Sequence, residues 1–330
     1  MLQDKGFLEV INSDDSNQSS RLVNTHQVIN YLDDKLYRKY EPTKQPCPGF
    51  MGRMKLWLDN VDSTEHKIAL YDLVLKIFFV GEEEFNSLYR VAFHEVIIPW
   101  VVDKESIEIT SDDFTPKIEA CMSQTWFCPI SDSLRINAFY HVNHIVGRDF
   151  RPDWRSLKKF ADKRKVEEFI KDSKIKRIVL LEDFVGSGGQ ALGIIDFLRT
   201  LDVDIDILLI PLVICPKGDS NIRDALKNDD ICYRPVVRVP DSEILSFNSV
   251  GFEGRNDAVI REISEQYSSI MNVAFKVDNN ERIEIGALGY RNTGALVVMY
   301  SNCPNNTISI IHRDTEEWMP LFPRSERYGS

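Results

Sequence analysis

The pattern of apolar and polar positions divides the chain into four predicted parts. Residues 1–25 are polar and rich in Ser, Asn and Asp, a composition that predicts a flexible arm. Apolar residues recur at helical spacing over 26–105, which predicts a helical region. Short apolar runs alternate with helical stretches over 106–275, and turn residues separate strand-like runs over 276–330. We therefore expect an α/β core between a helical region and a C-terminal β-rich extension.

Two helices of the helical region have predicted ends. The apolar spacing from Ile68 to Phe78 predicts a helix that stops before Gly81. The acidic residues 82–84 suit the positive end of a following helix. That helix should end at Pro99 or contain it in its last turn.

The core and the extension follow different strand patterns. Continuous apolar strands that alternate with helices are typical of a parallel sheet covered on both faces. The predicted core strands are 126–130, 178–181, 205–214 and 236–239, and the predicted core helices are 190–201 and one from Asp219 or Ser220 to about Asn228. In the extension, 287–300 and 308–311 are strand-like.

Composition and charge exclude several classes of function. With 43% hydrophobic and 28% charged residues, the 330-residue chain can bury a sizeable core. Its net charge of −11 argues against broad, non-specific binding to nucleic acid, although a local basic patch stays open. The sequence has no run of 18 apolar residues and no signal-peptide pattern at its start, so we expect no membrane association. Six cysteines without a CxxC pair suit reduced thiols in a cytoplasmic protein.

The clearest chemistry lies in segment 179–191, where a buried strand leads into two acids, a Gly/Ser loop and a helix. Backbone N–H groups of such a loop, together with the positive end of a helix, can bind one phosphate. Glu182 and Asp183 lie just before the loop and can accept hydrogen bonds from two ring hydroxyls. The pattern therefore favours a sugar phosphate. The loop consists of Gly186, Ser187, Gly188, Gly189 and Gln190.

Competing phosphate and nucleophile motifs do not fit this segment. A P-loop needs a Gly-Lys-Ser/Thr sequence, and no Lys is present. A dinucleotide fingerprint comes straight after its strand, but here two acids precede Gly186 and Gly188, and Ala191 stands at the third glycine position. A nucleophile elbow needs glycine where Val185 stands. A plain Gly-rich turn between strand and helix remains the alternative. Ligands of open parallel sheets bind at the carboxyl ends of strands, which favours a binding site here.

Segment 179–191 resembles the phosphoribosyl-pyrophosphate loop of type I phosphoribosyltransferases, with Gly186 and Gln190 in place of the usual hydroxyl residues. The tail 289–324 and the helical front half are similar to the PRTase-CE family of bacterial conflict systems, and the similarity covers most of 30–324. That family is associated with anti-phage defence loci, including retron-type systems. The resemblance implies a parallel sheet of the phosphoribosyltransferase type.

The resemblance also implies roles for individual residues. Glu182 and Asp183 would be the catalytic acids that hold the ribose, and the loop from Gly186 to Gln190 would hold the 5′-phosphate. Mg²⁺ would arrive on the substrate pyrophosphate rather than on a protein site. The pyrophosphate or acceptor side would include Ser131, Asp132, Ser133, Arg135 and Lys217.

Two of these assignments have plainer alternatives. The stretch 137–153 contains His141, His144, Arg148 and Arg151 and fits the mobile loop of the type I layout, or else a basic surface loop. Lys217 fits an ordinary turn cation equally well. The HxxH spacing of the two histidines has no further zinc ligands nearby in the sequence.

The expected function is binding of a phosphoribosyl compound, either phosphoribosyl pyrophosphate or a nucleotide, with transfer or hydrolysis at ribose C1 during anti-phage defence. The alternative is a nucleotide sensor or assembly subunit that binds without catalysis. Partners would be the phosphoribosyl or nucleotide ligand and other subunits of a defence system. The acceptor, the oligomeric state and the trigger stay open.

Overall fold

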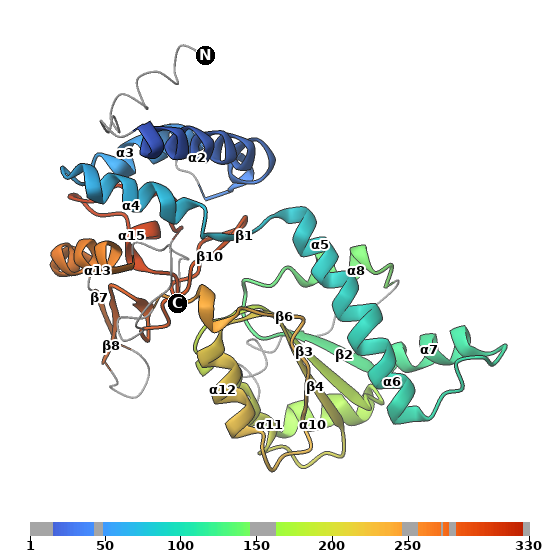
Figure 1. Cartoon of the computed structure of the whole chain (residues 1–330). Coiled ribbons are helices and arrows are strands. Elements are labelled where there is room, and N and C mark those ends of the chain that lie inside the picture. The colour runs from blue at the N-terminus through green and yellow to red at the C-terminus, as the bar shows by residue number, and fades with distance from the viewer. Residues whose placement is uncertain are drawn as a thin grey trace. The chain divides into compact units, whose positions relative to one another are not determined.

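The structure is a computed structural model that describes residues 16–42, 49–145, 163–245, 257–271, 273–276 and 282–325 (Figure 1). The chain divides into two compact units, one of Met1–Glu82 with Asp241–Ser330 and one of Glu83–Pro240. These boundaries differ from those of the four parts expected from the pattern of residues. The four-part division remains a prediction. Among the described helices, none combines the length and the apolar character that crossing a bilayer requires.

A parallel sheet forms the centre of the second unit, which confirms the α/β class. Its strands are β2 Thr125–Pro129, β3 Arg177–Val185, β4 Asp206–Ile214, β5 Cys232–Tyr233 and β6 Val237–Arg238. The order is β2-β3-β4-β5, with β6 also paired to β4, and every pairing is parallel. The predicted strands at 126–130, 178–181, 205–214 and 236–239 are therefore present, with ends shifted by a few residues.

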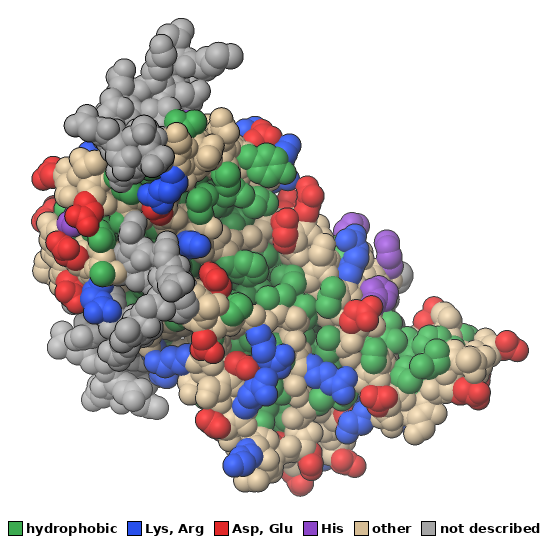
Figure 2. Space-filling model, in the orientation of Figure 1, with side chains coloured by type: hydrophobic (Ala, Val, Ile, Leu, Met, Phe, Trp, Pro, Cys, Tyr) green, Lys and Arg blue, Asp and Glu red, His purple; other side chains and the backbone are tan. Residues whose placement is uncertain are grey.

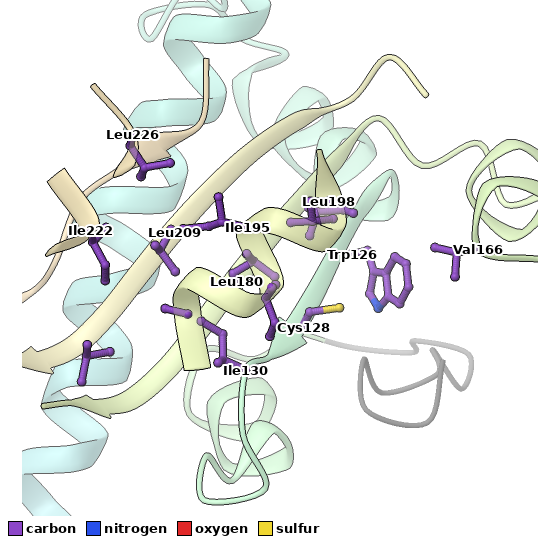
Figure 3. Packing of buried hydrophobic residues seen from close by; sticks show 14 of the residues in the cluster. Trp126, Cys128, Ile130, Val166, Leu180, Ile195, Leu198, Leu209, Ile222 and Leu226 are labelled. Atoms are coloured by element: carbon purple, nitrogen blue, oxygen red, sulfur yellow. The ribbon is translucent and has the colours of Figure 1, made fainter. Parts of the chain in front are cut away.

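Helices cover both faces of this sheet, as the continuous apolar strands predict. On one face, α10 Lys163–Asp172, α11 Gly189–Leu198 and α12 Pro216–Ala225 contribute Val166, Ile195 and Ile222 to a core with Trp126 and Leu180 (Figure 3). On the other face, the ring of Phe127 in β2 lies 5.5 Å from that of Phe139. Phe139 belongs to α8 Ile136–Val142 and also contacts Tyr89 of α5 Glu82–Val91.

The helix after α5 passes through Pro99 instead of ending there. A π-helical stretch, Ala92–Ile97, leads into α6 Ile98–Glu105, and α7 Phe114–Ser123 follows. The Ile98 N–H bonds to the Phe93 carbonyl, five residues back. This wider turn shifts the hydrogen-bond register just before Pro99, a residue that has no N–H to donate and crowds an ordinary helix. The expected stop at Pro99 was therefore wrong.

The first unit joins both ends of the chain. Its N-terminal part contains α2 Ser16–Lys35, a 3-10 turn Tyr37–Lys39, α3 Phe50–Leu58, α4 Thr64–Val74 and β1 Phe78–Val80. Its C-terminal part contains a 3-10 turn Asp241–Glu243, α13 Asp257–Gln266, α14 Ser268–Met271, β7 Val273–Lys276, β8 Arg282–Gly286, β9 Gly289–Tyr290, β10 Val297–Met299 and α15 Ser309–His312. β1 pairs with β10 in parallel, and β7, β8 and β9 form an antiparallel sheet.

Two expectations for this unit were wrong. Phe78 belongs to strand β1 and not to the preceding helix, which ends at Val74, because its backbone pairs with β10. The apolar run 308–311 forms most of the short helix α15 rather than a strand. A run of four residues with three isoleucines is too short to show a periodicity that separates helix from strand, so its tertiary contacts decide.

The C-terminal tail is buried in the first unit. The side chain of Trp318 is fully buried, and its Nε1 donates to the Ile310 carbonyl at 2.9 Å. Trp57 of α3 donates to the same carbonyl at 2.7 Å, and Arg53 donates to the Leu321 carbonyl at 2.9 Å. The tail motif that supports the family resemblance therefore has a structural role, since it fastens the end of the chain to the N-terminal helices.

Candidate functional site

The two acids lie near the carboxyl end of β3, where the strand departs from regular alternation. Leu180 and Val185 belong to the same core cluster, although residues five apart on a regular strand face opposite sides. The pairing of β3 with β4 also skips Asp183, whose carboxylate accepts the Phe184 N–H at 2.8 Å. The register of β3 against β4 is the same on both sides of Asp183, so no residue is inserted and the irregularity concerns side-chain directions alone. It allows the adjacent side chains of Glu182 and Asp183 to reach the same neighbouring loop.

That loop is Ser131–Ser133, which follows β2. The Ser131 N–H donates to Glu182 Oε2 at 2.9 Å, and the Ser133 hydroxyl donates to Asp183 Oδ1 at 2.9 Å. The Ser131 and Ser133 hydroxyls also bond to each other. Residues about fifty positions apart in the chain thus form one hydrogen-bonded group, and the predicted pyrophosphate-side serines adjoin the predicted ribose acids.

Burial changes the acid–base state of this group. The exposed fractions of Glu182 and Asp183 are 2% and 7%. Burial, followed by the adjacent charge of Asp183, raises the pKa of Glu182 well above its usual range, and the bonds to Ser131 oppose the shift only in part. Glu182 therefore holds a proton more readily than an exposed glutamate does. A protonated carboxyl can donate a hydrogen bond as well as accept one.

The glycine loop turns directly into α11. Gly188 has φ +85°, a backbone conformation that favours glycine, and precedes the first residue of the helix. The first N–H groups of a helix have no acceptor within it, so those of Gly189 and Gln190 can bind an anion. Gly186, Ser187 and Gly188 are buried, whereas Gln190 is exposed. The arrangement fits a phosphate bound by backbone N–H groups.

Helix α12 holds the loop from its other side. Asn221 Nδ2 donates to the Ser187 carbonyl at 2.9 Å. Gly218 packs so closely that a Cβ atom there would lie 2.8 Å from the Gly186 carbonyl oxygen. The helix begins at Pro216, earlier than the expected start at Asp219 or Ser220, because proline suits the first helical turn. Neither Gly218 nor Asn221 was predicted as a site residue, and their signal in the sequence is only their place after a predicted strand.

The remaining predicted residues are exposed or lie outside the described part, and the charge of Asp132 adds to the raised pKa of Glu182. Asp132, Arg135 and Lys217 have exposed side chains, and Lys217 precedes the Gly218 contact. His141 and His144 are exposed at the end of α8. Arg148 and Arg151 lie outside the described residues, as do all positions from 146 to 153 of the predicted mobile loop. Within the described part of the chain, no group of three or more His, Cys, Asp or Glu side chains could hold a metal ion.

Comparison with known proteins identifies the family. No curated protein and no solved structure matches the chain. The family model of PRTase-CE matches residues 54–324, a stretch that includes the acid pair, the glycine loop and the buried tail. The chain therefore belongs to the PRTase-CE family.

Proposed function

We propose that this protein binds phosphoribosyl pyrophosphate or a nucleotide and acts at ribose C1, by transfer or by hydrolysis. Membership of the PRTase-CE family indicates a phosphoribosyltransferase-like function. The observation that carries the finer proposal is the group at the end of β3, where Glu182 and Asp183 bond to Ser131 and Ser133 just before the glycine loop. An acid pair beside a phosphate-binding loop matches a ligand with two hydroxyls and a phosphate.

Each part of the site has a proposed role. The acids orient the ribose hydroxyls, and the charge of Asp183 stabilises positive charge that develops at C1. The backbone of Gly186–Gln190 holds the 5′-phosphate, while Ser131–Ser133 lies toward the pyrophosphate. Mg²⁺, carried by the pyrophosphate oxygens, would neutralise the leaving group. The ion is proposed to enter with the substrate.

The test is release of pyrophosphate. The purified chain is incubated with phosphoribosyl pyrophosphate and Mg²⁺, and pyrophosphate is followed over time. We expect release by the wild type, strong loss in Asp183→Asn, and full release in Gly193→Ala, whose new methyl group meets no atom within 4 Å. Equal rates in the wild type and Asp183→Asn would contradict the proposal.

A nucleotide sensor without catalysis is the second candidate. It is favoured by the burial of both acids and by Gly186 and Gln190, which stand where type I enzymes usually carry hydroxyl residues. Such a protein would bind phosphoribosyl pyrophosphate or a nucleotide, measured by calorimetry, and would release no pyrophosphate. Binding with release would exclude this candidate.

The proposed setting is anti-phage defence in the cytoplasm, together with other subunits of a defence system. This part rests on the family resemblance alone. The measurement is the plating efficiency of phages on bacteria that express the complete locus, with wild-type protein or with Asp183→Asn. Equal plating efficiency with the wild-type protein and with Asp183→Asn would show that the acid pair is not needed for defence.

A further inference from the structure

A second charged group lies in the parallel-sheet unit, centred on Asp219 in the first turn of α12. Its carboxylate accepts hydrogen bonds from the Tyr233 hydroxyl at 2.6 Å and from Arg223 Nε at 2.9 Å, and Arg238 Nε lies 3.3 Å away. Burial raises the pKa of this carboxyl, but its bonds to Tyr233 and Arg223 and the charge of Arg238 outweigh burial. The pKa therefore lies below its usual value, and Asp219 is ionised at neutral pH.

Both arginines use only a small part of their hydrogen-bonding capacity. An arginine side chain has five N–H donors in a planar fork. Within the described part of the chain, Arg223 and Arg238 contact Asp219 through Nε, and their side chains are 55% and 48% exposed. The other N–H donors of each fork are not engaged by Asp219. Two guanidinium groups against one carboxylate leave a net charge of +1 on this group.

Arg199 in the same unit shows what a purely structural arginine looks like. Its Nε donates to Asp229 at 2.8 Å, its Nη1 to Asp196 at 2.9 Å, and its Nη2 to the Ala225 carbonyl at 2.8 Å. All three nitrogens of that fork bond to the protein. The forks of Arg223 and Arg238 differ because Asp219 anchors them by one nitrogen each and leaves their amino ends for another acceptor.

The arginine pair lies where a ligand of this sheet would bind. Arg238 pairs with Ile214, the last residue of β4, so it is at the carboxyl end of the sheet. Gly218 and Asn221 of α12 contact the glycine loop, whereas Asp219 and Arg223, four residues apart, share another side of the helix. Figure 2 shows Lys and Arg side chains gathered where Figure 1 draws α12, β4 and β6.

We propose that Arg223 and Arg238 form a second anion site, which binds a phosphate group of the acceptor or second ligand, beside the glycine loop. The assignment of this phosphate to an acceptor rests on the proposed function, whereas the binding of an anion by the two arginines does not. Asp219 and Tyr233 are positioning residues that hold the two forks side by side. Guanidinium forks match both carboxylate and phosphate. Two forks converging from different elements favour phosphate, which offers more oxygens than a carboxylate.

The experiment separates the two anion sites by their probes. The glycine loop is first saturated with ribose 5-phosphate, and inorganic phosphate is then titrated in a calorimeter. We expect the wild type to bind phosphate under these conditions. The double variant Arg223→Gln/Arg238→Gln should lose about tenfold to a hundredfold in phosphate affinity, since charge-assisted bonds are removed. Its affinity for ribose 5-phosphate should change less than about twofold, because Gly218 and Asn221 contact the loop from another side of α12 than Arg223, and Arg238 belongs to β6.

Two control variants keep the result interpretable. Arg199→Gln removes a structural arginine of the same unit and should leave phosphate affinity unchanged. Arg223→Lys/Arg238→Lys keeps the ion pairs with Asp219 and so protects the fold, but it removes the planar forks. This variant should also bind phosphate more weakly than the wild type. Its melting temperature, compared with that of the wild type, shows that the fold is retained.

Several outcomes would overturn the proposal. These are absence of phosphate binding by the wild type, equal phosphate affinity in the double glutamine variant, and equal loss in Arg199→Gln. Acetate that binds as tightly as phosphate would overturn the phosphate assignment. If ribose 5-phosphate does not bind but phosphate binds through the arginines, the proposed function of the loop fails and the arginine site stands.

Discussion

At the scale of single residues, Glu182 illustrates how position changes the chemistry of a carboxyl group. An exposed glutamate is charged at neutral pH, but Glu182 is buried beside Asp183 and its pKa is raised well above the usual range. Burial disfavours the charged form, and a neighbouring negative charge disfavours it further. The pair therefore stores an unfavourable interaction that a ligand with hydroxyl donors can relieve.

The double variant Glu182→Gln/Asp183→Asn tests this account. The folded protein binds a proton at Glu182 more tightly than the unfolded chain does, so this residue lowers stability as pH rises above the unfolded pKa. We expect the variant to melt at an equal or higher temperature than the wild type at pH 8, with a smaller gain at pH 5. Binding of phosphoribosyl pyrophosphate should fall by about tenfold to a hundredfold for each acid.

The measurement is a melting curve at both pH values, with and without phosphoribosyl pyrophosphate. A variant that melts far below the wild type without ligand would mark the acids as structural. A variant that keeps the full ligand-induced shift would contradict their assignment to the ribose.

At the scale of elements, the contact of α12 with the glycine loop is the feature that shapes the candidate site. Two glycines of this unit form a matched pair. A Cβ atom on Gly218 would lie 2.8 Å from the Gly186 oxygen and 2.9 Å from Val185 Cγ1, whereas one on Gly193 of α11 would meet nothing within 4 Å. The two positions therefore separate the effect of close packing from the effect of helix propensity.

We expect Gly218→Ala to lower the free energy of unfolding by about 1–3 kcal/mol, because α12 must move away from the loop. Its affinity for ribose 5-phosphate should fall as well. Gly193→Ala should stabilise the protein by about 0.5–1 kcal/mol, since alanine favours a helix over glycine, and should leave binding unchanged. Urea denaturation and calorimetry measure the two effects. Equal behaviour of the two variants would show that the approach of α12 to the loop does not matter.

At the scale of the whole molecule, the first unit depends on residues from both ends of the chain. Trp57 and Trp318 donate to the same Ile310 carbonyl, and the Tyr40 hydroxyl donates to the Pro323 carbonyl at 2.9 Å. Helix α15 and the tail therefore stabilise the N-terminal part of this unit directly. The second unit has its own core around the parallel sheet.

Trp318→Ala should destabilise the first unit by about 3–5 kcal/mol, because a fully buried indole and its hydrogen bond are lost. The neighbouring Met319 is 46% exposed, so Met319→Ala should change stability by less than about 0.5 kcal/mol. Hydrogen exchange read by mass spectrometry should become faster in α3 and α15 of Trp318→Ala, while β3 and β4 stay protected. Faster exchange throughout β3 and β4 as well would indicate that the two units unfold together.

Several strands and helices were predicted correctly from the sequence, whereas some of their ends and one short helix were not. The strands β3 and β4 and the helix α11 were predicted because their apolar patterns are clear, although β3 extends to Val185, beyond the predicted 178–181. The passage through Pro99 and the helix α15 were missed. At Pro99 the π-helical turn lets the helix continue, and in α15 the contacts of Trp57 and Trp318 with Ile310 accompany a helix that a few residues do not predict.

The strand, the acid pair, the glycine turn and the helix start of segment 179–191 could all be predicted, because these features follow from residue types adjacent in the chain. Which distant residues join them depends on how the chain folds. The bonds of Ser131 and Ser133 to the acids depend on the register of β2 against β3. The meeting of Arg223 and Arg238 at Asp219 depends on how α12 packs beside β5 and β6. Such contacts are set by burial and by strand pairing across the fold, and no local pattern of residues encodes them.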